Sequence, residues 1–230
     1  MDAVARVQGI NIFIGPPGSG KGSVSRICTQ GGSIVQLSTG NLCRQHIAEG
    51  TEIGRRIDLA IKSGKLIPDE LVSTMVLTWL RTIDSSVDVI LDGYPRTEGQ
   101  ARALHDFLQE SPGKYRVQVF VFSAPDDAVL ARILARRICS NSSCQAVYSA
   151  TDVRFVPQLR NACDYCGAEL MRRADDYDGP ARDRVETYHR HARELIKFYE
   201  HSHYRMVTVD ASQDPQKILS EIRDAIGVCA

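Results

Sequence analysis

The segment with the clearest chemistry is a glycine-rich stretch near the N-terminus. Gly15-Pro16-Pro17-Gly18-Ser19-Gly20-Lys21 matches the spacing G-x-x-x-x-G-K and lies between an apolar run and an amphipathic stretch. Glycines let several backbone N–H groups point at one anion, a helix start adds partial positive charge, and a lysine can reach a terminal phosphate. The segment therefore predicts a phosphate-binding loop. Gly22 and then Ser23 follow the lysine, where Ser or Thr more commonly comes directly after it.

Four of the seven cysteines form two close pairs, Cys139-x4-Cys144 and Cys163-x2-Cys166. Zinc prefers four tetrahedral ligands, and thiolates suit it. In a reducing compartment, paired cysteines indicate a metal rather than disulfides. Four protein ligands leave no open position, so the site would be structural and would order a segment too small for its own core. Four free cysteines, a disulfide pair and a nucleic-acid-binding zinc module remain alternatives.

Composition narrows the class of protein. The chain has 28 basic and 28 acidic residues, a formal net charge of +0, and 43% hydrophobic residues. A protein that binds nucleic acid through phosphate neutralisation usually carries a basic excess, so no nucleic-acid partner is expected. The apolar run 10–14 is too short for a secretory or membrane segment, and no run approaches membrane-spanning length. We therefore expect a soluble, cytoplasmic protein with no membrane partner.

Short apolar runs alternate with amphipathic stretches along the chain. Strands are predicted at 10–14, 33–36, 87–91, 117–122 and 206–209. Helices are predicted at 21–30, 41–49, 51–62, 68–81, 97–109, 125–138, 178–199 and 215–226. Gly64 is expected to stop the helix at 51–62. This alternation predicts an α/β fold, a doubly wound five-stranded parallel sheet with helices on both faces.

Two segments interrupt the alternation and are interpreted as inserts. Residues 39–71 form a helical insert, and residues 139–174 form a small, polar, cysteine-rich one. The core domain then comprises 1–38, 72–138 and 175–230. Asp92 ends the third predicted strand at its carboxyl end, where ligand sites form in α/β sheets.

Several motifs together resemble the adenylate kinase family. The phosphate loop continues as Gly-Lys-Gly-Ser; Leu37-Ser38-Thr39-Gly40-Asn41-Leu42-Cys43-Arg44 is similar to the family's Ser-Thr-Gly-Asp-x-x-Arg; and Asp92-Gly93-Tyr94-Pro95-Arg96 matches its Asp-Gly-[Phe/Tyr]-Pro-Arg. The likeness continues through Arg132, Arg136, Arg173, Asp175-Asp176 and Arg184, and covers nearly the whole chain in order. Asn41 stands where the family has Asp, and the first cysteine pair has four intervening residues where the family has two.

The resemblance implies a role for each matching residue. On the ATP side it implies phosphate contacts from the loop and Lys21, Arg132 stacked on the base, and Tyr148 nearby. The full set of implied ATP contacts is Gly15, Pro16, Pro17, Gly18, Ser19, Gly20, Lys21, Gly22, Ser23, Arg132, Arg136 and Tyr148. On the AMP side, Arg44 and Arg96 would hold the phosphate, and Thr39 and Gln100 would contact the adenine. The implied AMP set is Thr39, Arg44, Gly93, Arg96, Gln100, Arg173 and Arg184.

The same resemblance implies a catalytic set of Lys21, Asp92, Arg96, Arg136, Arg173 and Arg184, with Asp92 orienting waters on Mg²⁺. Phosphoryl transfer needs two anionic substrates held in line with their charge neutralised, and arginine suits this because it is always charged and forks onto phosphate oxygens. The expected reaction is reversible, Mg²⁺-dependent transfer from ATP to AMP giving two ADP, with zinc in the second insert, the lid.

Two other functions remain open on sequence alone. A UMP/CMP-type nucleoside monophosphate kinase would share most of these motifs, although Thr39 and the long lid favour AMP. A catalytically idle nucleotide-binding relative is the third possibility. We find no Asn-Lys-x-Asp guanine signature, so a regulatory GTPase is not expected. The resemblance also implies a monomer whose inserts close over the substrates and exclude water.

Overall fold

A five-stranded parallel sheet forms the centre of the molecule. The computed structural model describes residues 7–62, 67–142 and 144–227. Its strands are β1 (Gln8–Ile14), β2 (Ile34–Ser38), β3 (Asp88–Asp92), β4 (Tyr115–Ser123) and β8 (Arg205–Asp210), in the order β2-β3-β1-β4-β8. Every neighbouring pair in this order is parallel. The predicted α/β fold with a doubly wound parallel sheet is confirmed.

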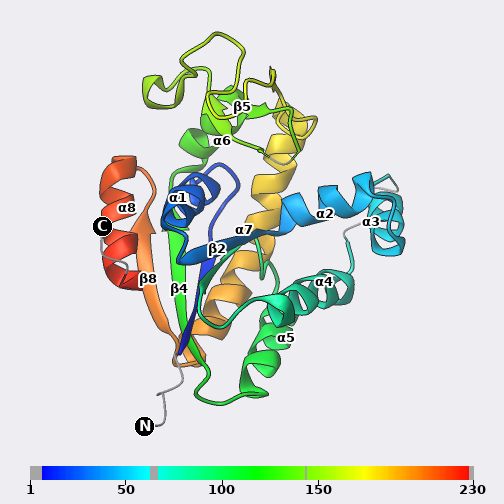
Figure 1. Cartoon of the computed structure of the whole chain (residues 1–230), viewed down its shortest axis with the longest axis vertical. Helices are drawn as coiled ribbons and strands as arrows, with labels where there is room; N and C mark the ends of the chain where they lie inside the picture. Colours follow the sequence, from blue (N-terminus) through cyan, green and yellow to red (C-terminus); the bar gives the residue numbers. More distant parts are fainter. Residues whose placement is uncertain (1–6, 63–66, 143, 228–230) are drawn as a thin grey trace.

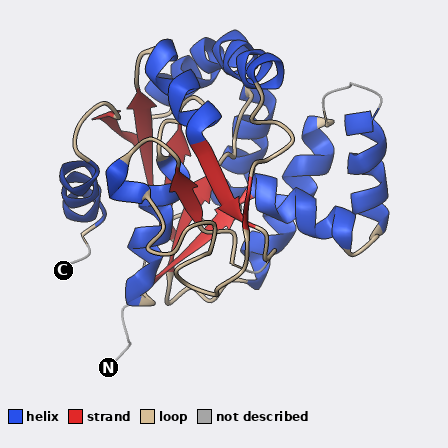
Figure 2. Ribbon diagram, turned by 90° about the horizontal axis from the view of Figure 1, so that it is seen from above, coloured by secondary structure: helices blue, strands red, loops and turns tan. Residues whose placement is uncertain are grey.

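Helices cover both faces of this sheet (Figures 1 and 2). They are α1 (Lys21–Cys28), α2 (Thr39–Ala48), α3 (Glu52–Lys62), α4 (Asp69–Thr82), α5 (Glu98–Gln109), α6 (Asp126–Ala135), α7 (Asp178–His201) and α8 (Pro215–Ile226). Alternate residues of β1 face opposite sides. Ile10, Ile12 and Ile14 pack with α4, α5 and α7, whereas Phe13 packs with α1 and α8.

Helices α2 and α3 stand out to one side of the sheet in Figure 1. Their closest approach is at Gly54, where an added Cβ would lie 1.9 Å from the carbonyl oxygen of His46. Only a residue without a side chain allows these two backbones to meet, so Gly54 fixes the packing of the pair. Gly64, expected to end the second of these helices, lies outside the described residues.

The cysteine-rich segment contains more regular structure than its sequence predicts. The helix predicted at 125–138 ends at Ala135, because Arg136 adopts an extended conformation with φ −62° and ψ 139°. The chain continues as β5 (Arg136–Cys139), which pairs antiparallel with β6 (Val147–Ser149) and β7 (Leu170–Met171). The expectation of helix to Ile138 is therefore wrong. An extended backbone lets Arg136 leave the helix and turn towards the carboxyl ends of the central strands.

The described helices include none long and apolar enough to cross a membrane.

Candidate active site

The glycine-rich loop between β1 and α1 wraps around the amino group of Lys21. Its Nζ donates hydrogen bonds to the carbonyl oxygens of Gly15 and Pro16, each at 2.7 Å, and to Ser19 Oγ at 3.1 Å. Gly18 and Gly20 have φ of 84° and 90°, in the left-handed region that favours glycine. A Cβ on Gly18 would also lie 2.8 Å from the carbonyl oxygen of Val129. The loop is thus shaped by its glycines and holds Lys21 at its centre.

Asp92 lies beside this loop because β3 is the neighbour of β1, with Phe13 and Asp92 in register. A Cβ on Gly22 would lie 3.1 Å from Asp92 Oδ2. A larger residue directly after Lys21 would push this carboxylate away, which gives a physical reason for the departure from Ser or Thr at that position. Gln36 Nε2 donates to the same oxygen at 3.2 Å.

Basic side chains from distant parts of the chain converge on Lys21. Burial lowers the pKa of Lys21 from 10.5 to about 8; Asp92 opposes this shift, while the charges of Arg96, Arg136 and Arg184 add to it. Charges influence one another's pKa most strongly in poorly solvated surroundings, so these side chains belong to one electrostatic cluster. The predicted arginines therefore meet at the carboxyl ends of the central strands.

Arg96 joins this cluster of charged side chains from the turn after β3. Its Nε donates to the carbonyl oxygen of Gly93 at 2.8 Å, and a Cβ on Gly93 would lie 2.9 Å from Arg96 Nη2. The φ of Gly93 is 83°, so this position requires glycine for its conformation as well as for space. Burial is the largest cause of a lowered pKa of Arg96, opposed by Asp92.

Asp176 holds two of the arginines of this cluster by ion pairs. It has no exposed surface and receives Arg136 Nε at 2.7 Å on Oδ2, Arg136 Nη2 on Oδ1, and Arg184 Nη1 at 3.1 Å on Oδ1. Burial alone would raise the pKa of Asp176, but the hydrogen bond and charge of Arg136 outweigh it, and the pKa is lowered. Ion pairs of this kind fix arginine side chains in one orientation.

Arg173 is the least satisfied of the predicted arginines. Its buried Nε has no hydrogen-bond partner within the described part of the chain. The pKa of Arg173 is lowered to about 10, chiefly by burial and then by the charges of Arg136 and Arg44, while Asp175 and Asp176 oppose the shift. A guanidinium without a full set of partners, next to two others, is a favourable site for a multivalent anion.

Arg44, on α2, completes the cluster from the helical insert. Its Nη2 donates to Asn41 Oδ1 and, at 3.3 Å, to Gln145 Oε1 in the cysteine-rich segment. Burial lowers its pKa most, and among the other causes are the charges of Asp175, Arg136 and Arg184. Asn41, the residue that departs from the family pattern, therefore contacts the arginine that follows it in the motif.

The remaining predicted residues are positioned as follows. Thr39 is buried and its Oγ1 donates to the carbonyl oxygen of Asp92 at 3.4 Å. Arg132 Nη1 donates to the carbonyl oxygen of Ala211, at 2.8 Å, at the end of β8. Tyr148 is 6% exposed inside the cysteine-rich segment, where its hydroxyl donates to Cys163 Sγ at 3.5 Å. This burial does not support the expected contact between Tyr148 and the ATP base.

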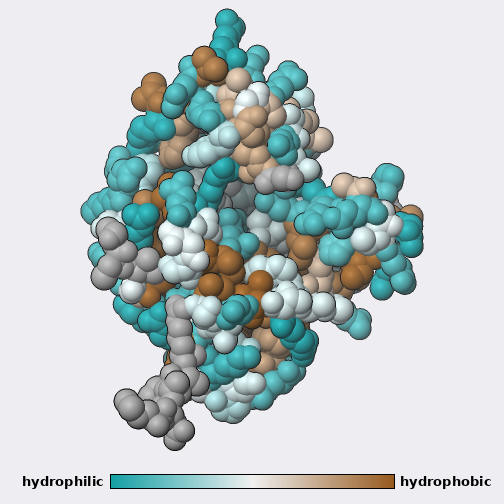
Figure 3. Space-filling view, in the orientation of Figure 1, coloured by the Kyte–Doolittle hydropathy of each residue, from teal (hydrophilic) through white to brown (hydrophobic). Residues whose placement is uncertain are grey.

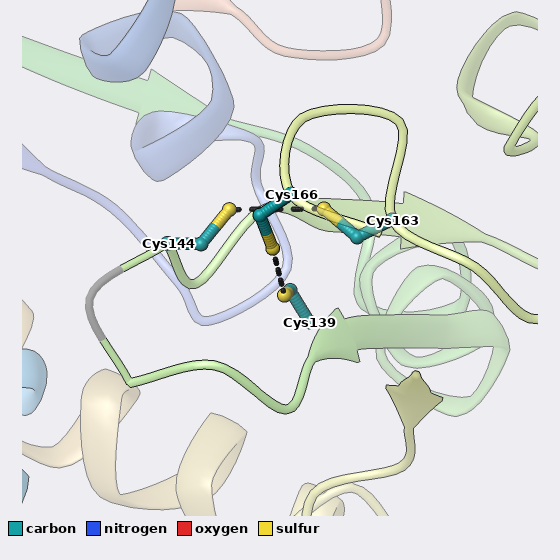
Figure 4. A group of neighbouring side chains, drawn as sticks. All are labelled: Cys139, Cys144, Cys163 and Cys166. Atoms are coloured by element: carbon teal, nitrogen blue, oxygen red, sulfur yellow. Dashed lines mark hydrogen bonds between the residues drawn. The ribbon is translucent and has the colours of Figure 1, made fainter. Parts of the chain in front are cut away.

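The four paired cysteines come together at one point (Figure 4). Their sulfur atoms all lie within 4.8 Å of one another. The Sγ atoms of Cys139 and Cys166 are 3.3 Å apart, and those of Cys144 and Cys163 are 3.7 Å apart. Both distances are too long for a disulfide bond. Four cysteine thiolates are a ligand set that zinc prefers. Although four residues separate Cys139 from Cys144, both of their sulfur atoms lie in the cluster.

One contact around the cysteine cluster has no signal in the sequence. Arg26, on the last turn of α1, donates through Nη1 to the carbonyl oxygen of Cys144 at 3.0 Å, and its guanidinium carbon lies 4.3 Å from the centre of the Tyr165 ring. It therefore touches both cysteine loops. In the sequence Arg26 is an ordinary arginine of an amphipathic helix, and nothing indicates that its partner lies more than a hundred residues away.

Comparison with known proteins places the chain in a family. The family model described as adenylate kinase matches residues 13–204. An adenylate kinase of Thermosipho melanesiensis is 34% identical over 215 residues, 94% of this chain and 98% of that protein. One of Archaeoglobus fulgidus is 37% identical over 211 residues, 92% of this chain and 94% of that protein. With matches of this extent, and with the motif residues gathered around Lys21, the chain belongs to the adenylate kinase family of nucleotide phosphotransferases.

Proposed function

We propose that this protein catalyses the reversible, Mg²⁺-dependent transfer of the terminal phosphoryl group of ATP to AMP, giving two ADP. The observation that carries the proposal is the convergence of Lys21 with Arg44, Arg96, Arg136, Arg173 and Arg184 from five separate segments. Six positive charges gathered around one point repel one another, and a polyanion bound among them would compensate this repulsion. Two nucleotides facing each other through their phosphates provide such a polyanion.

The positions of these groups suggest a division of labour. Lys21 and the loop N–H groups hold the donor phosphates, while Arg44 and Arg96 hold the acceptor phosphate. Arg136, Arg173 and Arg184 surround the group in transfer, so an oxygen of the acceptor phosphate attacks the terminal phosphorus as the bond to the departing ADP breaks. Positioning and charge neutralisation of this kind account for most of the catalysis of phosphoryl transfer.

Magnesium would enter with ATP, beside Ser23 and Asp92. When bound, it neutralises the donor phosphate oxygens, as in other phosphoryl-transfer enzymes. The proximity of the Asp92 carboxylate to Gly22 supports this location. Asp92 then needs no direct bond to the metal, because a carboxylate can orient metal-bound water.

Cys139, Cys144, Cys163 and Cys166 would hold a structural zinc ion. Four thiolates fill a tetrahedral site and leave no position for substrate, so the metal supplies stability rather than chemistry. The small apolar cluster around these cysteines supports this role, because its described buried members are only Cys139, Ala146, Tyr148, Cys163 and Leu170. Without a metal such a segment buries too little surface to be stable alone.

The three-part division into a core, an acceptor insert (39–71) and a lid (139–174) belongs to the same proposal. Arg44 comes from the acceptor insert and Arg173 from the lid, so the full set of arginines assembles only when both lie close to the core. Closure of the two over the substrates would exclude water, which otherwise hydrolyses ATP.

Two measurements test this proposal: a coupled assay with each nucleoside monophosphate as acceptor, and analysis of the metal content of the purified protein. We expect ADP formation from ATP with AMP as the preferred acceptor, and one zinc per chain. Preferred turnover of UMP or CMP would instead assign the pyrimidine branch of the family. Tight ATP binding without ADP formation would indicate a catalytically idle relative.

A further inference from the structure

A network of hydrogen bonds around Asp69 fixes the orientation of the Gln100 amide next to Arg96. Asp69 is the first residue of α4, and its carboxylate lies at the start of α5. Its Oδ1 accepts a hydrogen bond from Gln100 Nε2 at 2.7 Å, and its Oδ2 accepts one from Thr97 Oγ1 at 2.5 Å. Gln100 Oε1 in turn accepts from the backbone N–H of Arg96 at 2.8 Å.

These contacts define which end of the Gln100 amide is which. If the amide were turned over, Oε1 would face the Asp69 carboxylate and Nε2 would face the Arg96 N–H, which are two repulsive contacts. Amide orientation in a structure is assigned from partners of this kind, and here both partners agree. Gln100 is 4% exposed, so water cannot easily replace either partner.

The surroundings are built to keep the carboxylate in place. A Cβ on Gly99 would lie 3.2 Å from Asp69 Oδ2, so glycine leaves the space that the carboxylate occupies. Thr97 caps α5 by accepting from the Gln100 N–H at 3.2 Å while donating to Asp69. The start of a helix also favours a negative charge.

Among the described residues the Gln100 side chain has one partner on each of its two polar atoms, which leaves one N–H on Nε2 and one lone pair on Oε1 for a ligand. Arg96 links this amide to the arginine cluster, because its backbone N–H contacts Gln100 while its guanidinium lies near Lys21. In the proposed function Gln100 contacts the base of the acceptor nucleotide whose phosphate Arg96 holds, and the backbone contact between the two residues is compatible with that arrangement. An amino-substituted base offers an amino donor next to a ring-nitrogen acceptor. A keto base instead offers a carbonyl acceptor next to a ring N–H donor.

We propose that Asp69 is a specificity-determining residue that selects amino-substituted over keto-substituted bases by locking the Gln100 amide in one orientation. This inference rests on the proposed function, because it concerns the base of the acceptor nucleotide. Asp69 does not touch the substrate; it acts through Gln100 as a positioning residue. A site built to hydrogen-bond one arrangement of donor and acceptor strongly rejects the reverse arrangement.

The test compares AMP with IMP, which differ at the amino or keto position and have nearly the same shape. For the unmodified protein we expect kcat/KM for AMP to exceed that for IMP by about 100-fold or more. In Asp69→Asn the new side chain can offer either an oxygen or an amide N–H to Gln100, and only the Arg96 N–H still orients it. We therefore expect the AMP-to-IMP ratio to fall by about 10-fold or more, mainly through KM.

Glu70→Gln is the matched control, because it neutralises the neighbouring carboxylate on the same turn of α4, and that side chain is exposed. It should leave the ratio unchanged. Asp69→Ser is a second variant that removes the carboxylate with a small side chain and carries the same expectation as Asp69→Asn. Thermal melting of each variant shows whether it is folded.

The proposal is overturned if the unmodified protein uses AMP and IMP equally well, or if the Asp69 variants lose activity with both acceptors by the same factor. The latter result would mean that Asp69 only supports the fold. If the protein forms no ADP at all, the proposed function fails, and calorimetric binding of AMP and IMP to the same variants still decides the proposal. Equal binding of the two by the unmodified protein would then contradict it.

Discussion

The acceptor insert and the lid solve the same problem in two ways. In the proposed function, each is a short segment that must stay folded while it closes over the substrates. In the acceptor insert, Cys43 and Ile57 pack with Leu71 and Met75 of α4, so its apolar cluster continues into the core. In the lid, two of the buried members of the cluster are themselves cysteines of the proposed metal site. The difference indicates that the insert depends on apolar packing and the lid on its thiolates.

The surface of the lid supports this comparison. Val153 and Leu159 are 86% and 71% exposed, and Figure 3 shows hydrophobic side chains at the outer end of the lid. Large apolar residues on the surface contribute no burial. These two residues lie outside the small buried cluster of the lid, so the lid needs another source of stability.

The largest expected effect comes from breaking the cysteine cluster. Cys163→Ser should abolish stoichiometric zinc binding and should remove the sensitivity of thermal melting to a chelator, since structural zinc contributes about 10 kcal/mol or more in isolated zinc peptides. Metal content per chain and melting curves measure this. The matched control is Cys43→Ser, which alters a buried cysteine of the acceptor insert and should leave metal content unchanged. Equal metal content in Cys163→Ser and the unmodified protein would contradict the proposed site.

A second prediction separates the roles of the two inserts in catalysis. Arg173→Ala, in the lid, should lower kcat by about 10²–10³, because it removes a positive charge that stabilises the phosphoryl group during its transfer. Arg44→Ala, in the acceptor insert, should chiefly raise KM for AMP. Steady-state kinetics with each substrate varied in turn distinguish the two patterns. Arg182→Ala is the control, since this exposed arginine pairs with Asp178 on the outer side of α7. A large loss of activity in that variant would show that the losses are not specific to the arginines around Lys21.

Packing in the acceptor insert is expected to be sensitive to a single methyl group. Gly54→Ala would place a Cβ 1.9 Å from a backbone oxygen of α2, which must move. We expect a loss of about 3 kcal/mol in the free energy of unfolding, at the upper end for overpacking. Gly179→Ala, in the first turn of α7, meets nothing within 4 Å and should instead stabilise the protein by about 0.5–1 kcal/mol. Chemical denaturation measures both, and similar values for the two would show that α2 and α3 are not in close contact.

The smallest expected effect concerns Lys21, over which both inserts would close. Its pKa of about 8 in the unliganded protein means that the charged form, which binds phosphate, is lost as pH rises through that value. KM for ATP should therefore rise above about pH 8, and Lys21→Arg should remove this rise because arginine remains charged. A pH profile of KM measures it. A profile that is flat from pH 7 to pH 9 in the unmodified protein would contradict the lowered pKa.

The lowered pKa of Lys21 also makes the free energy of unfolding depend on pH. Because the pKa of Lys21 falls from 10.5 to about 8 on folding, the unfolded chain binds more protons between these two values. The contribution of Lys21 to the free energy of unfolding therefore increases with pH across that window and is least favourable below about pH 8.

Much of the site could be predicted from the sequence because its motifs are local. The loop from Gly15 to Lys21 and the turn from Asp92 to Arg96 each lie at the end of a strand, and strand periodicity together with glycine spacing locates such turns. The end of α6 could not be predicted in this way. Arg136 is compatible with a helix, and only its ion pair with Asp176, together with pairing of β5 with β6, accounts for the extended backbone.

The sequence alone determined the alternation of strands and helices, the phosphate loop and the two cysteine pairs, because each depends on residues close together in the chain. Tertiary structure decided which side chains meet across long separations. It brought Asp69 to Gln100, Arg26 to Cys144 and Asp176 to Arg136. Contacts of this kind depend on how packed elements orient whole helices, and no local pattern of residues encodes that orientation.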